Sequence, residues 1–82
     1  MWSLYIIRCN DNTLYIGITS NLKQRIESHN KGTGAKYTRG RGPVKLVYTE
    51  SYPDRSKASQ REYALKKLSL REKINLIENN IY

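Results

Sequence analysis

Five polar side chains in this sequence stand among apolar neighbours in predicted strands and helices. Tyr5 and Tyr15 lie in two runs that alternate as β-strands do. Arg25 and His29, four residues apart, fall on the apolar stripe of one predicted helix, and Glu62 interrupts the stripe of another. Together, such groups can place positive charge on a phosphate, hold a cation at a leaving oxygen and move a proton. Their types indicate the chemistry of phosphodiester cleavage.

Each of these side chains also has a purely structural explanation. A tyrosine in a strand usually packs against its neighbours, and a helix histidine is often a satisfied group at the core edge. Arg25 can lie along the core edge with its head in water. Glu62 can pair with Lys66, which is worth about 0.3–0.5 kcal/mol when exposed, although its apolar neighbours Ala58 and Leu65 disfavour an exposed position. The catalytic interpretation requires all five side chains to meet around one accessible hollow.

The carboxylates limit the metal chemistry that the chain can perform. There are seven, and no two stand at a recognisable metal-ligand spacing. A two-metal site needs clustered acids and is therefore not expected. One Mg²⁺ held by a single carboxylate, waters and a substrate phosphate is compatible with the sequence.

The tyrosines belong to a predicted β-hairpin. Its strands cover residues 2–7 and 13–19, and the turn-prone residues 10–12 join them. If the strands pair odd residues with odd ones, Tyr5, Tyr15 and Gly17 share one face. Gly17 would then leave a bare patch of sheet between two phenols.

A helix, a strand and two further helices follow the hairpin. Ser20 or Asn21 caps the first helix, which runs to about Asn30 and ends at Gly32. Pro43 precedes a strand over residues 44–50 that we expect beside the first strand, although spacing alone does not fix that order.

The two helices after this strand also have start signals. One begins at residues 53–54 and runs to about Leu68, and Ser69 caps the last one. The apolar stripe of the last helix is formed by Leu70, Ile74, Ile77 and Ile81. We predict one α+β domain over residues 1–82, a three-stranded antiparallel sheet with ββαβαα order flanked by three helices.

The charge of the chain indicates a polyanionic partner. The net charge is +8, and no acidic residue occurs between Glu27 and Glu50. The candidate nucleic-acid contacts in this glycine-rich stretch are Lys36, Tyr37, Arg39 and Arg41. A solvated loop is the alternative. The single cysteine, and the lack of an apparent signal peptide or membrane span, predict a cytoplasmic protein without a membrane partner, and a monomer is favoured.

With these residues identified, the chain resembles the GIY-YIG endonuclease domain. This module occurs in the excision-repair nuclease UvrC, in homing enzymes and in some restriction enzymes. Ser3-Leu4-Tyr5 stands where the family has Gly-Ile-Tyr, and Tyr15-Ile16-Gly17 matches its Tyr-Ile-Gly. Arg25, His29 and Glu62 match the family's arginine, a histidine of several members and the metal-binding glutamate. The resemblance covers nearly the whole chain.

The chain is most similar to small stand-alone bacterial members, which are related to nucleases that cut branched DNA. Residues 34–39 resemble the basic loop of that group. Two departures stand out. The first motif lacks its glycine, and a polar residue of larger members falls near Ile74; we do not transfer its role to Asn75.

The resemblance implies an endonuclease that hydrolyses DNA, with a role in repair or recombination, and RNA is the other candidate substrate. Tyr5 is the first choice for general base and Tyr15 for positioning, and the two are interchangeable on sequence grounds. Arg25 and His29 would make the phenol more acidic, and Glu62 would hold one Mg²⁺ or Mn²⁺. The competing functions are a non-catalytic basic nucleic-acid-binding module and a structural protein of a nucleoprotein particle.

Overall fold

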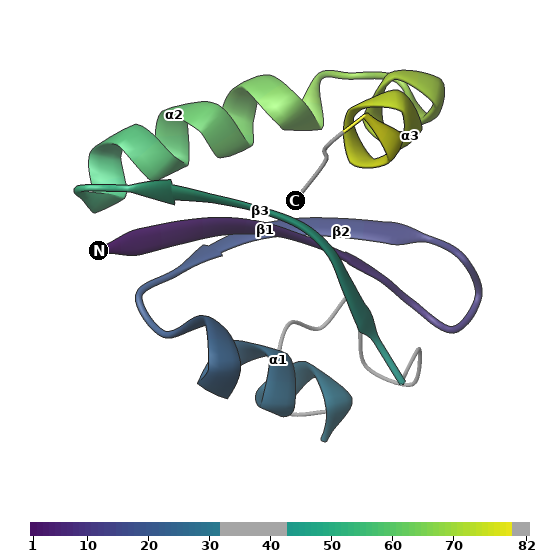
Figure 1. Cartoon of the computed structure of the whole chain (residues 1–82), viewed down its shortest axis with the longest axis horizontal. Coiled ribbons are helices and arrows are strands. Elements are labelled where there is room, and N and C mark those ends of the chain that lie inside the picture. The colour runs from purple at the N-terminus through teal and green to yellow at the C-terminus, as the bar shows by residue number, and fades with distance from the viewer. Residues whose placement is uncertain (32–42, 80–82) are drawn as a thin grey trace.

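The computed structural model describes residues 1–31 and 43–79. Within them it contains one three-stranded sheet and three helices (Figure 1). In chain order these are β1 (Trp2–Arg8), β2 (Leu14–Thr19), α1 (Leu22–Asn30), β3 (Lys45–Tyr52), α2 (Arg55–Lys66) and α3 (Leu70–Glu78). The predicted α+β class and ββαβαα order are confirmed.

The hairpin turn is formed by residues suited to it. Asn12 has a φ of 68°, a left-handed conformation that asparagine tolerates better than most side chains. The Cys9 amide donates to the Thr13 carbonyl at 2.8 Å, and the Asp11 carboxylate accepts the Thr13 hydroxyl. These bonds fix the register of the two strands that the turn connects.

The register pairs odd residues with odd ones. Tyr5 faces Gly17 and Ile7 faces Tyr15, so the two tyrosines and the glycine share one face of the sheet, as predicted. The strand order is β2-β1-β3 and all pairs are antiparallel. The expected position of β3 beside β1 is therefore confirmed.

The two faces of the sheet carry separate cores. Helices α2 and α3 cover one face and α1 covers the other (Figure 1). The residues buried on the α2 face are Leu4, Ile6, Ile16, Tyr48 and Leu65. On the α1 face, Tyr5, Ile7, Cys9 and Val44 are buried against Leu22 and Ile26. The tyrosines therefore lie beneath α1.

The helices begin where the capping signals place them. Asn21 and Asp54 each accept a backbone N–H of the first turn, and Ser69 forms a reciprocal capping box with Glu72. Helix α2 ends at Lys66, two residues before the predicted end, and β3 extends to Tyr52 rather than Glu50.

The apolar stripe of α3 differs from the prediction. Leu70 is 60% exposed, whereas Ile77 packs on the core as predicted, together with Leu76, which the predicted stripe did not include. Gly32 and Ile81 lie outside the described residues. Every helix in the described part of the chain falls short of the length and apolarity that crossing a bilayer requires.

Candidate active site

A hydrogen-bonded cluster joins β1 to α1 around the Tyr5 phenol. The Tyr5 hydroxyl lies 3.0 Å from His29 Nε2, and Arg25 Nε donates to the same hydroxyl at 3.3 Å. Arg25 and His29 are one helical turn apart, which places both over one ring. Tyr5 and His29 are 0% and 1% exposed, so this part of the cluster is closed to solvent.

Gly17 makes room for that ring. A β-carbon at position 17 would lie 2.5 Å from the Tyr5 hydroxyl oxygen and 2.7 Å from Cζ, closer than real β-carbons approach. The predicted bare patch of sheet is therefore covered by Tyr5 itself. The glycine is needed for close approach of the ring.

Tyr15 occupies the more open side of the cluster. It is half-buried, and its ring centroid lies 5.3 Å from that of His29 and 6.4 Å from that of Tyr5. Hydrogen bonding to Tyr5, with smaller contributions from Tyr15, raises the pKa of Arg25 above its usual value. The guanidinium therefore interacts with both phenols.

The electrostatics of the cluster correct one sequence prediction. Burial raises the pKa of Tyr5, and this outweighs the lowering caused by Arg25. Burial, and then the charge of Arg25, lower the pKa of His29. Tyr5 is therefore not made more acidic, and His29 is neutral at pH 7 rather than a second positive charge. Arg25 supplies the fixed cation.

Glu62 lies on α2, which covers the opposite face of the sheet from α1. Its side chain is 22% exposed, and its Oε2 lies 3.4 Å from Lys66 Nζ. The ion pair that was the structural explanation of Glu62 is therefore present. Its negative charge makes a minor contribution to raising the pKa of Tyr5, after burial and Tyr15.

The requirement that all five candidate side chains share one hollow is not met at the β2 edge. Of the five, only Tyr15 lines the hollow there. This hollow has a volume of about 280 Å³, and its lining includes Tyr15 of β2, Lys66 of α2 and Lys73 of α3. Because β2 is an edge strand, groups attached to either face can meet around it. The sequence interpretation named Lys66 only as an ion-pair partner of Glu62, and it did not name Lys73, which lies on the next helix.

A second polar cluster fixes α2 to the sheet. Glu50 of β3 accepts hydrogen bonds from the hydroxyls of Tyr48 and Tyr52 and from Arg61 Nε at 3.0 Å and Nη2 at 3.2 Å. Burial opposes ionisation of Glu50, but these bonds hold its pKa below the usual value. Burial and Glu50 raise the pKa of Tyr48 to about 12. Arg61 directly precedes Glu62, so this cluster holds the part of α2 that carries Glu62.

The donor set fits one divalent ion and not two. In the stretches 1–31 and 43–79, no group of three His, Cys, Asp or Glu side chains could hold a metal. Glu62 offers one partly accessible carboxylate, which is sufficient for an Mg²⁺ that keeps waters and binds substrate phosphate. The predicted nucleic-acid contacts Lys36, Tyr37, Arg39 and Arg41 lie outside the described residues.

Comparison with known proteins gives consistent matches over most of the chain. UPF0213 protein CPE1444 of Clostridium perfringens is 54% identical over 76 residues, which cover 93% of this chain and 82% of that protein. UPF0213 protein DP2720 of Desulfotalea psychrophila is also 54% identical, over 94% of this chain and 71% of that protein.

Two solution structures share the fold. The UPF0213 protein BH0048 from Bacillus halodurans aligns with a TM-score of 0.62 at 44% identity, over 95% of this chain and 84% of that one. Protein EF2693 from E. faecalis gives a TM-score of 0.62 at 35% identity, over 98% of this chain and 88% of that one.

The family comparison names the same module that the sequence motifs resemble. The GIY-YIG catalytic domain matches residues 1–75, which include Tyr5, Tyr15, Arg25, His29 and Glu62. The family is one of nucleases, which generally use divalent metal ions and act on nucleic acids. This chain belongs to the GIY-YIG family.

Proposed function

We propose that this protein is a metal-dependent endonuclease that hydrolyses DNA phosphodiester bonds. The proposal rests on the position of the Arg25 guanidinium. It donates a hydrogen bond to the buried Tyr5 and interacts with the half-buried Tyr15. A fixed cation beside an accessible phenol is suited to holding a phosphate and the water that attacks it. Branched DNA of repair and recombination is the substrate class that we propose.

Burial divides the roles of the two phenols. A water molecule and a phosphate can reach Tyr15, which is half-buried, whereas Tyr5 is enclosed. We therefore assign the contact with attacking water to Tyr15 and the positioning of Arg25 and His29 to Tyr5. This assignment reverses the preference drawn from sequence alone, because sequence does not report which tyrosine is covered.

The hydrogen bond between Arg25 and Tyr5 has a defined direction. Arg25 Nε can only donate, so the Tyr5 oxygen accepts from it. The lowered pKa of His29 keeps the imidazole neutral. In the tautomer that carries its proton on Nδ1, Nε2 accepts the Tyr5 proton. These hydrogen bonds orient the Arg25 guanidinium. The guanidinium stabilises the negative charge that grows on the phosphate as water attacks in line.

Glu62 is the residue that we propose as ligand of one Mg²⁺ or Mn²⁺. When bound, the ion supplies positive charge at the leaving oxygen. Lys66 forms an ion pair with Glu62 in this structure. We propose that Lys66 contacts a substrate phosphate instead when the metal ion binds Glu62.

The test is cleavage of a labelled panel of branched, duplex and single-stranded DNAs, with Mg²⁺ or Mn²⁺ and with chelator. We expect metal-dependent cuts, and a loss of at least about a hundredfold in rate for Arg25→Ala and for Glu62→Gln. Lys23→Ala removes an exposed positive charge on α1, and Glu78→Gln removes an exposed carboxylate on α3. The two variants serve as controls. Wild-type rates in both site variants would overturn the proposal.

The alternative is a basic nucleic-acid-binding module without catalysis. The ion pair between Glu62 and Lys66 favours it, because it explains the carboxylate without a metal. That function predicts binding that is indifferent to Mg²⁺ and no new DNA ends after long incubation. The cleavage panel distinguishes the two functions directly.

A further inference from the structure

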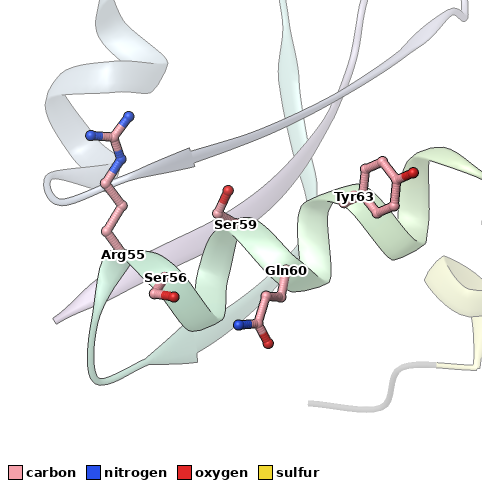
Figure 2. A pocket seen from close by; sticks show the side chains of 5 residues that line it. All are labelled: Arg55, Ser56, Ser59, Gln60 and Tyr63. Atoms are coloured by element: carbon pink, nitrogen blue, oxygen red, sulfur yellow. The ribbon is translucent and has the colours of Figure 1, made fainter.

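An unassigned groove runs along the outer side of α2 (Figure 2). It has a volume of about 620 Å³, and its lining residues are Arg55, Ser56, Ser59, Gln60 and Tyr63. All five side chains can form hydrogen bonds, and none is acidic. A guanidinium, two hydroxyls, an amide and a phenol are groups that contact phosphate, sugar and base edges in nucleic-acid complexes.

Tyr63 gives the groove an aromatic platform. Its side chain is 66% exposed, and Lys67 Nζ lies 4.2 Å from the ring centroid. An exposed ring next to a cation is suited to stack an unpaired base while the ammonium contacts the adjacent phosphate. Bases in a closed duplex do not offer a free face to such a ring.

The charge of this region complements a nucleic-acid strand. Residues 55–73 contain seven Lys or Arg but only two acidic residues, Glu62 and Glu72. Both carboxylates are already engaged, Glu62 with Lys66 and Glu72 with the α3 capping box. Arg61 and Lys66 are paired with Glu50 and Glu62, and the remaining cations leave this segment with a net positive charge.

The groove adjoins the proposed cleavage site. Ser59 lies one helical turn before Glu62, and Tyr63 directly follows Glu62. Lys66, one turn further along α2, lines the hollow at the β2 edge together with Tyr15. Helix α2 has 12 residues, so it is about 18 Å long, the length of about five stacked nucleotides. A strand along this face of α2 would pass beside the helical position of Glu62, which does not itself line the groove.

We propose that the outer face of α2 binds single-stranded DNA that flanks the scissile phosphate, with Tyr63 stacking on a base and Lys67 and Arg55 contacting phosphates. The proposal deepens the nuclease function and rests on it for the identity of the substrate. The binding itself requires no metal and no cleavage.

The experiment is fluorescence anisotropy with a labelled twelve-nucleotide oligothymidine and with a hairpin duplex, both in chelator so that no cleavage occurs. We expect Tyr63→Ala to weaken single-strand binding about tenfold and to change duplex binding by less than about twofold. Tyr63→Phe, which keeps the ring, should bind as the wild type does.

Charge is tested separately by Lys67→Ala, with Lys57→Ala as a matched control on an exposed position of α2 outside the groove. Lys67→Ala should reduce the salt slope of single-strand binding by about one, and Lys57→Ala should leave it unchanged. Unchanged binding by Tyr63→Ala, or an equal loss on duplex, would overturn the proposal. Absent cleavage with intact Tyr63-dependent binding would instead overturn only the nuclease function.

Discussion

The Tyr5 hydroxyl lies where a side chain at position 17 would begin. A β-carbon at Gly17 would come within 2.5 Å of the Tyr5 oxygen, and Arg25 and His29 are bonded to that same oxygen. Gly17, the third residue of the Tyr-Ile-Gly motif, therefore leaves room for the Tyr5 ring. Tyr5 in turn orients Arg25 and His29 of α1.

Gly17→Ala tests this relationship. The added methyl must displace a fully buried ring, so we expect the free energy of unfolding to fall by about 1–3 kcal/mol and cleavage to fall with it. Urea unfolding measures the stability. Ser51→Ala, at an exposed position of β3, is the control for alanine in a strand. Stability equal to that of the control would show that Tyr5 moves aside without cost.

The two phenols should differ in what they lose on removal of the hydroxyl. Tyr15→Phe should lower kcat by about 10²–10⁴-fold and cost less stability than Tyr5→Phe, because Tyr15 is only half-buried. Tyr5→Phe should also lower stability, by about 1–3 kcal/mol, because Arg25 and His29 lose a buried partner. Single-turnover cleavage and urea unfolding on the same samples separate the effects. The opposite pattern would return the role of base to Tyr5.

His29 predicts a pH dependence of stability. Burial holds the pKa of this imidazole below its ordinary value, so the unfolded chain takes up a proton that the folded protein resists. The contribution is fully present above about pH 6.5 and is lost as the pH falls from there through the lower folded pKa. Urea unfolding between about pH 8 and about pH 5 measures it.

His29→Gln is the matched variant for this measurement. The chain has one histidine, so no other imidazole contributes to the dependence near neutral pH. A slope that persists in the variant would assign the effect to other groups.

The bond between Glu50 and Arg61 should contribute to stability and to activity. Arg61→Ala leaves a partly buried carboxylate without its cation, and we expect a loss of about 1–2 kcal/mol, discounted because Arg61 is partly exposed. Lys57→Ala on the same helix should stay within about 0.5 kcal/mol. Because Arg61 precedes Glu62, the apparent affinity for activating metal should weaken as well. Stability loss without any change in metal dependence would limit the pair to a role in folding.

The sequence was sufficient for the fold because its local signals agreed with the packing. The period of two in the hairpin, the caps Asn21, Asp54 and Ser69, and the position of β3 all match the structure. The sequence alone could not show which of the polar side chains are buried. Whether Tyr5 or Tyr15 is enclosed, and whether Arg25 outweighs desolvation, depends on how α1 rests on the sheet.

The acidic residues show a similar limit. Spacing placed Glu62 on an apolar stripe but could not show that α2 lies on the other face from α1. The cluster around Glu50 was missed, although tyrosines at positions 48 and 52 flank the carboxylate at strand spacing. Pairing with Arg61 required the tertiary arrangement.

The place of β2 at the margin of the sheet bears on the thermal stability of the candidate site. Among the described strands, β2 exchanges ladder bonds only with β1, and it carries both Tyr15 and Gly17. Margins fray at a lower free energy than central strands, so amide protons of β2 should exchange with deuterium before those of β1. Inactivation on warming would then track this partial opening and precede the global melt.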